Sequence, residues 1–166
     1  MNRIPLLFAL MLLASVLLVG CSEETPQLKN GEPAPPFTLN TLGSEPVSFP
    51  ADLEGKVVAI RFWADWCPFC ESEMKLLEPV YQQYRNKGLV ILAVNVRQTP
   101  DTVESFLAKL NVSYDSLLDR EGGVARQYGV MGLPTTFFVS RDGVLKSRIL
   151  GESTPETFEK IILEML

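Results

Sequence analysis

Residues 62–70 read FWADWCPFC, in which Cys67 and Cys70 stand two residues apart with a proline between them. The 166-residue chain contains no histidine at all. This absence excludes cysteine–histidine nucleophile pairs, and it excludes zinc or haem sites that would use the chain's own imidazole. The reactive chemistry left to this sequence is therefore that of sulfur.

The residues around the cysteine pair predict a strand before it and a helix after it. Residues 57–63 (VVAIRFW) are almost continuously apolar, which is typical of a strand buried on both faces. Apolar residues then recur at helical spacing over 74–84, and Pro79 is expected to kink this helix. Pro68 occupies a position that a helix N-terminus favours, so we expect Cys67 at the head of the helix, where free backbone N–H groups stabilise a thiolate.

Cys70 is expected on the same helix face as Cys67 and within reach of it. The two thiols can then close a small disulfide ring and open it again. A static disulfide or a metal site would use the same residues. However, two thiols without histidine make a poor zinc cage, and a stabilising bridge gains more from closing a longer loop. We predict a redox-active pair, with no bound metal and no cofactor.

The rest of the chain alternates strands with helices. A short hairpin over 37–49, turning at Gly43 and Ser44, precedes the first buried strand. Further elements are expected as strands at 89–96, 114–118, 135–140 and 144–150, and as helices at 100–110, 124–128 and 155–166. This order predicts an α/β fold, namely a three-layer sandwich with a mixed central sheet and helices on both faces.

The pattern W-C-x-x-C after a buried strand resembles the active site of the thioredoxin superfamily, most closely its extracytoplasmic TlpA/ResA/CcmG branch. The similarity covers about residues 31–166 and includes the segment Gly132-Leu133-Pro134-Thr135. It implies a thioredoxin-like domain over 37–166. It also implies that Pro134 is cis and faces the cysteine pair.

The resemblance implies a thiol-disulfide oxidoreductase in which Cys67 attacks a substrate disulfide and Cys70 resolves the mixed disulfide. The branch implies reduction of protein disulfides, with apocytochrome c as one possible target and a membrane thiol donor of the DsbD/CcdA kind as the recharging partner. The edge near Leu133 and Pro134 would hold the substrate backbone as an added strand.

Two charged residues near the pair are singled out by the same comparison. Glu73 stands where the branch carries a glutamate facing the active site, which implies that it tunes the proton affinity of Cys70 and relays its proton. The alternative is a solvated carboxylate. Arg61 departs from the family, which has aspartate or asparagine in its place. We expect Arg61 to favour the thiolates, or to pair with Glu73 or Asp65.

Aromatic side chains surround the motif. Trp63 is expected in the core. Trp66 and Phe69, with Pro68 between the cysteines, are candidates for an apolar rim that a substrate peptide touches. A packing role for Trp66 and Phe69 is an equally good explanation.

The N-terminus is typical of an exported chain. Residues 4–20 are almost entirely apolar and follow Arg3, as in a signal peptide over 1–20. The sequence Leu-Val-Gly-Cys at 18–21 resembles the lipobox of bacterial lipoproteins, which implies cleavage before Cys21 and a lipid on its thiol. An uncleaved membrane anchor or an ordinary leader are the alternatives. The polar, proline-rich stretch 21–36 is predicted to be a flexible tether, which places the domain outside the cytoplasm, near a membrane.

Net charge and motif spacing weigh against other functions. The net charge of −5 disfavours a nucleic-acid partner. A thiol peroxidase of the peroxiredoxin type would carry threonine or serine three residues before the attacking cysteine, where Ala64 stands. A copper carrier of the Sco type, or a similar non-catalytic module, would carry C-x-x-x-C and histidine, and this sequence has neither.

Overall fold

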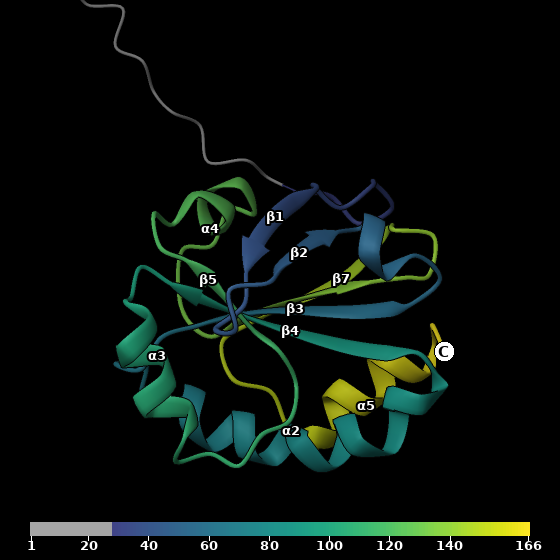
Figure 1. Cartoon of the computed structure of the whole chain (residues 1–166). Helices are drawn as coiled ribbons and strands as arrows, with labels where there is room; N and C mark the ends of the chain where they lie inside the picture. Colours follow the sequence, from purple (N-terminus) through teal and green to yellow (C-terminus); the bar gives the residue numbers. More distant parts are fainter. Residues whose placement is uncertain (1–27) are drawn as a thin grey trace, which may run out of the picture.

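The computed structural model describes residues 28–166, so the predicted leader (1–20), the predicted lipidation site Cys21 and the first part of the predicted tether lie outside the described residues. A mixed five-stranded sheet forms the centre of the domain, as predicted (Figure 1). Its strands are, in sheet order, β5 (Ser116–Asp119), β4 (Leu89–Val96), β3 (Val57–Trp63), β6 (Thr135–Val139) and β7 (Leu145–Leu150).

The central strand is β3, which runs parallel to β4 and antiparallel to β6. Every residue of β3 is buried. This explains its continuous apolar sequence, because a strand covered on both faces needs apolar side chains in both directions. Arg61 is the exception, since it is charged and fully buried.

Two layers cover the sheet, which confirms the predicted three-layer sandwich (Figure 1). One face packs against α2 (Cys70–Tyr84), α3 (Pro100–Leu107) and α5 (Pro155–Leu163). The other face packs against α4 (Gly123–Gln127) and a separate two-stranded sheet of β1 (Phe37–Asn40) and β2 (Pro46–Phe49). Successive residues of β3 point to opposite faces of the sheet, so alternate side chains pack in the hydrophobic core on each face.

The predicted starts of α3 and α5 are confirmed. Thr99 and Thr154 each accept a hydrogen bond from a first-turn N–H through the side-chain hydroxyl, and a proline follows each of them. These are favourable capping and first-turn residues. Helix α2 continues through Pro79 and ends at Tyr84.

Residues 28–36 pack on the domain, which corrects their assignment to a flexible tether. The Leu145 N–H donates to the Glu32 carbonyl over 2.9 Å, and the Tyr128 hydroxyl donates to the Pro35 carbonyl over 2.6 Å. Strand β7 lies at a sheet edge, where backbone groups need partners. Proline lacks an N–H but keeps its carbonyl, so a proline-rich segment can still accept these bonds. The ordered domain therefore begins earlier than predicted.

We expect Tyr128→Phe to loosen this segment. Burial raises the pKa of Tyr128 above its ordinary value, so the hydroxyl keeps its proton and acts as the donor. Loss of that hydrogen bond should cost about 1 kcal/mol in urea unfolding and speed proteolytic cleavage within 28–36. The control is Tyr81→Phe, whose hydroxyl bonds to none of the described residues. Equal cleavage of the two variants would contradict the expectation.

Candidate active site

Cys67 and Cys70 form a disulfide just beyond the C-terminal end of β3. Two consecutive turns carry the chain from the strand to the helix: the Cys67 N–H donates to the Ala64 carbonyl, and the Cys70 N–H donates to the Cys67 carbonyl, each over 3.2 Å. The Cα atoms of the two cysteines lie 5.4 Å apart. The structure therefore holds the predicted pair in its oxidised form.

The start of α2 differs from the prediction. The helix begins at Cys70, with Phe69 as the residue before it, so Pro68 lies in the preceding turn and not in the first helical turn. The fixed φ of proline suits the second position of a β-turn as well as the start of a helix, and here the turn prevails. Cys67 thus precedes the helix by three residues, and Cys70 is its first residue.

The disulfide is covered, whereas its surroundings are open. Cys67 is 2% exposed and Cys70 is fully buried, so Cys67 is less accessible than predicted in this oxidised state. Trp66 is 68% exposed and Phe69 is 51% exposed. Such exposure does not support a packing role for either aromatic side chain. The surface beside the buried disulfide is therefore an exposed apolar rim of Trp66 and Phe69.

The Leu133–Pro134 peptide bond is cis, as the family resemblance implied. Strand β6 begins at the next residue, Thr135, which pairs with Phe62 near the end of β3. This register places Pro134 at the same end of the sheet as the cysteines. The backbone N–H and carbonyl of Leu133 form no hydrogen bond within residues 28–166, so both are free to pair with an added strand.

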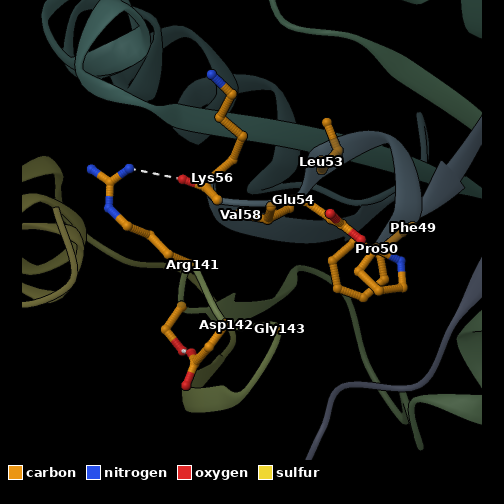
Figure 2. A pocket seen from close by; sticks show the side chains of 11 residues that line it. Phe49, Pro50, Leu53, Glu54, Lys56, Val58, Arg141, Asp142 and Gly143 are labelled. Carbon is orange, nitrogen blue, oxygen red and sulfur yellow. Dashed lines mark hydrogen bonds between the residues drawn. The ribbon is translucent and has the colours of Figure 1, made fainter.

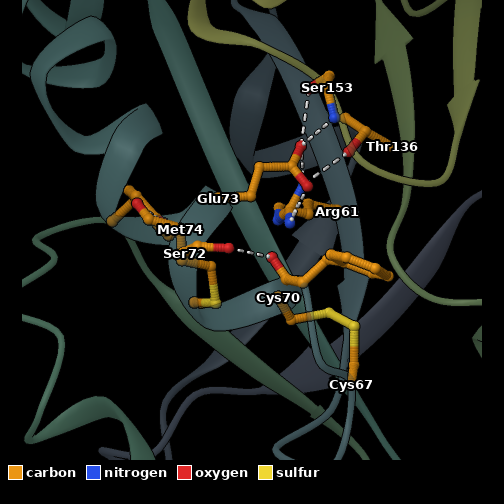
Figure 3. Close-up of polar contacts among 10 residues, drawn as sticks. Arg61, Cys67, Cys70, Ser72, Glu73, Met74, Thr136 and Ser153 are labelled. Atoms are coloured by element: carbon orange, nitrogen blue, oxygen red, sulfur yellow. Dashed lines mark hydrogen bonds and ion pairs between the residues drawn. A yellow bond between two sulfur atoms is a disulfide. The ribbon is translucent and has the colours of Figure 1, made fainter.

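Arg61 and Glu73 form a buried ion pair, which confirms one of the two partners expected for Arg61 (Figure 3). Arg61 Nη1 lies 2.7 Å from Glu73 Oε1, and Arg61 Nη2 donates to Glu73 Oε2 over 2.8 Å. Ser153 adds two donors to Glu73 Oε1, its Oγ at 2.7 Å and its backbone N at 3.2 Å. Glu73 is fully buried, so the alternative of a solvated carboxylate is wrong.

The carboxylate of this pair belongs to the helical turn that Cys70 begins. Glu73 follows Cys70 by one helical turn, and residues at this spacing are neighbours on a helix surface (Figure 3). Both oxygens of Glu73 already accept hydrogen bonds from Arg61 or Ser153. Such a carboxylate is suited to set the local electrostatic potential, and less suited to pass a proton than the resemblance implied.

A polar network anchors the loop that carries Cys67. The Asp65 N–H donates to Gln98 Oε1 over 2.9 Å, and Asn95 Nδ2 donates to the same oxygen over 2.8 Å. The Gln98 amide in turn donates to the Asp65 carboxylate. Gln98 and Ser153 could not be found from the sequence, because 33 residues separate Gln98 from Asp65 and 80 separate Ser153 from Glu73, and no local pattern connects them.

A hollow of about 330 Å³ lies around Arg141, at the end of β3 opposite to the cysteines (Figure 2). Arg141 donates to the backbone carbonyls of Gly55, Lys87 and Leu166, so its guanidinium is already occupied. No cysteine lines this hollow. The three hydrogen bonds of Arg141 hold separate segments of the chain together at this end of the domain.

Two further features are missing from the described part of the chain. Between residues 28 and 166, no cluster of three or more cysteine, aspartate or glutamate side chains is arranged to hold a metal ion. Over the same residues, no helix has both the length and the apolar character needed to cross a bilayer.

Comparison with known proteins identifies the family. Residues 30–148 match the AhpC/TSA family. The chain belongs to the AhpC/TSA family. The thiol-disulfide oxidoreductase ResA of Bacillus cereus is 31% identical over 146 residues, covering 88% of this chain and 84% of the relative. ResA of Geobacillus kaustophilus is 36% identical over 130 residues, covering 78% and 74%.

A solved structure supports the same conclusion. A Chlorobium tepidum protein assigned as the thiol:disulfide interchange protein DsbE superposes with a TM-score of 0.79 at 30% identity, covering 84% of this chain and 99% of that one. This AhpC/TSA member is therefore a thiol-disulfide oxidoreductase of the ResA/DsbE type with a thioredoxin-like fold.

We expect Glu73→Gln and Arg61→Met to shift the redox potential of the cysteine pair in opposite directions. Glu73→Gln leaves the guanidinium charge uncompensated, which favours thiolate at Cys70 and makes the potential less negative. Arg61→Met leaves the carboxylate charge uncompensated, which disfavours thiolate at Cys70 and makes the redox potential more negative. Shifts on the order of 30 mV, or 1.4 kcal/mol, should be resolved by equilibration with glutathione.

The control for these variants is Glu71→Gln, which changes an exposed carboxylate of the same helical turn that pairs with Lys75. It should leave the potential unchanged. Loss of one partner from a buried pair also costs about 3 to 5 kcal/mol of stability, so each variant must first be shown to be folded by circular dichroism. Shifts of the same sign in both buried variants would contradict the expectation.

Proposed function

We propose that this oxidoreductase is a membrane-tethered, extracytoplasmic reductase of protein disulfides. The observation that carries the proposal is the Cys67–Cys70 disulfide at the end of β3, beside Pro134 and an exposed apolar rim. A covered but reactive disulfide ringed by apolar side chains suits exchange with another protein more than with a small solute.

Reduction of a substrate proceeds in two exchanges. The thiolate of Cys67 attacks one sulfur of the substrate disulfide, a mixed disulfide forms, and the other substrate sulfur leaves as a thiolate and takes a proton from water. Cys70, once deprotonated, then attacks the Cys67 sulfur and releases the second substrate thiolate. Two electrons pass to the substrate, and the protein is left with the disulfide seen here.

The substrate chain would bind along the segment that precedes β6. The free N–H and carbonyl of Leu133 offer two backbone hydrogen bonds, and Pro134 limits how far a chain can enter. Trp66, Pro68 and Phe69 would contact the residues beside the substrate cysteine. These contacts involve mostly apolar surface and main chain, so they fit many sequences.

The proposed direction of electron flow, toward the substrate, rests on two features of the site. The residues between the cysteines, Pro68 and Phe69, lack the histidine that strongly oxidising relatives of this fold carry. The neutral Arg61–Glu73 pair adds no net positive charge that would stabilise a thiolate. Both features favour a reductant. A membrane dithiol donor of the DsbD/CcdA kind would recharge Cys67 and Cys70, and apocytochrome c is a candidate target by analogy.

Other reactions of this fold fit the site less well. Ala64 stands three residues before Cys67, so the hydroxyl that a peroxiredoxin would carry there is missing. Metal transport of the Sco type would need a histidine ligand that the sequence lacks. We therefore propose neither of these functions.

Cys70→Ser should trap the substrate. Without the resolving thiol, the mixed disulfide on Cys67 persists, and the trapped partner can be recovered from the native host and identified by mass spectrometry. The matched control, Cys67→Ser, keeps one thiol but should trap nothing. The unaltered chain should reduce insulin, and both variants should lose at least 100-fold in rate, the lower end of the loss expected when a catalytic group is removed. Absence of any trapped partner together with an inert unaltered chain would refute the proposal.

Cys21→Ser should release the chain from the membrane. The tether proposed here runs from Cys21 only to the ordered domain at Leu28, so a lipid on Cys21 would hold the domain within a short distance of the bilayer. Fractionation of cells should find the unaltered chain in the membrane fraction and carrying labelled fatty acid. If the serine variant remains in that fraction, an uncleaved anchor replaces the lipid.

A further inference from the structure

A groove of about 520 Å³ opens beside the disulfide. Its lining includes Trp66, which precedes Cys67, and Leu133, which precedes Pro134. The groove therefore has in its lining the chain neighbour of the reactive cysteine and the backbone edge proposed to hold the substrate. A chain joined to Cys67 through a disulfide would have its flanking residues at this opening.

One side of the groove is apolar and exposed. Met131 is 85% exposed and Trp66 is 68% exposed, while Leu133 is half-buried between them and the core. Large apolar side chains gathered on the surface of a domain are typical of a binding site. This side can take an apolar residue of a substrate chain.

The other side carries two arginines, Arg97 and Arg126, both exposed. Within residues 28–166 the ion pairs are Arg61–Glu73 and Lys75–Glu71, so neither groove arginine has a carboxylate partner there. Within the described part of the chain, the Arg126 side chain donates one hydrogen bond, to the backbone carbonyl of Glu121 over 2.8 Å. The lining of the groove thus contains two arginines and no acidic residue, in a chain whose net charge is −5.

Arg97 is placed at the groove by the backbone. Its φ is +60°, in the left-handed region, which is costly for a residue with a side chain and is often found at functional sites. Its stem lies over Gly122, where an added Cβ would come within 2.5 Å of Arg97 Nε. Gly122 thus leaves the space that this arginine occupies.

We propose that this groove is a substrate subsite that selects protein disulfides with an acidic side chain close to the reactive cysteine. The inference rests on the proposed reductase function. The segment flanking the substrate cysteine places an apolar side chain against Trp66 and Met131, and it places a carboxylate between Arg97 and Arg126. Charge-assisted hydrogen bonds from the two guanidinium groups to the carboxylate supply the selectivity. Elsewhere on the surface, the net negative charge of the chain repels acidic partners.

The test compares peptide disulfides that differ at one residue. The full-length chain, purified in detergent and reduced, is given peptides with Glu, Gln or Lys at each of the three positions on either side of the cysteine. At one or more positions, kcat/KM should be about three- to ten-fold higher for Glu than for Gln, and lower for Lys, at low ionic strength. Added salt should reduce this ratio, because exposed charges are screened.

Substitutions then assign the preference to the groove. Arg97→Gln and Arg126→Gln should each lower the Glu-to-Gln ratio, and together they should bring it close to one. Replacing both arginines by glutamate should reverse the preference toward the Lys peptide. Arg120→Gln is the matched control, because Arg120 is an exposed arginine nearby that lines a different hollow. It should keep the ratio of the unaltered chain.

The outcomes separate the two proposals. If the unaltered chain reduces none of the peptides, the reductase function itself fails. If it reduces the Gln peptide but shows no preference for Glu, or keeps that preference without the arginines, the groove inference fails while the reductase stands. Should the variants of Arg97 not fold, Arg126→Gln alone decides the question, since Arg126 has no unusual backbone conformation to preserve.

Discussion

The buried pair of Arg61 and Glu73 constrains the whole active end of this domain. A charge in the middle of a fully buried strand loses its hydration, and this cost is recovered only with a partner of good geometry and further hydrogen bonds. Glu73, on α2, is the charged partner of Arg61, and Ser153, in the loop before α5, donates further hydrogen bonds to the Glu73 carboxylate. Because Glu73 must meet Arg61, the first turn of α2 has a defined position against β3. Cys70, in the same turn, is placed with it.

The disulfide is buried, whereas the surface around it is exposed to solvent. The sulfur atoms lie at the edge of the α2-side core, where water is scarce and charges act strongly. The surfaces around them are exposed: an aromatic rim, the backbone of Leu133, which has no hydrogen-bond partner among residues 28–166, and a groove with two arginines on one side. Selectivity for a partner would then reside in these surfaces, and the role proposed for Arg61 and Glu73 is to set the reactivity of the sulfur from within the core.

The sequence by itself determined most of the framework. Continuous apolar residues identified β3 at its observed bounds, capping threonines identified the starts of α3 and α5, and the two cysteines with Pro134 identified the chemistry. The periodicity and the caps are local signals, whereas Pro134 was connected with the cysteines through the family resemblance. Trp63 was placed in the core because it belongs to the buried strand, and it is fully buried.

Only the tertiary structure decided the partners and the access. Glu73 could have been solvated or buried until Ser153, 80 residues away, was found beside it. The packing of 28–36 on β7, the start of α2 at Cys70 and the covering of Cys67 also depend on neighbours distant in sequence. Periodicity reports which face of an element is apolar, but it does not report which distant groups will satisfy a given charge or carbonyl. That information arises only when the chain has packed.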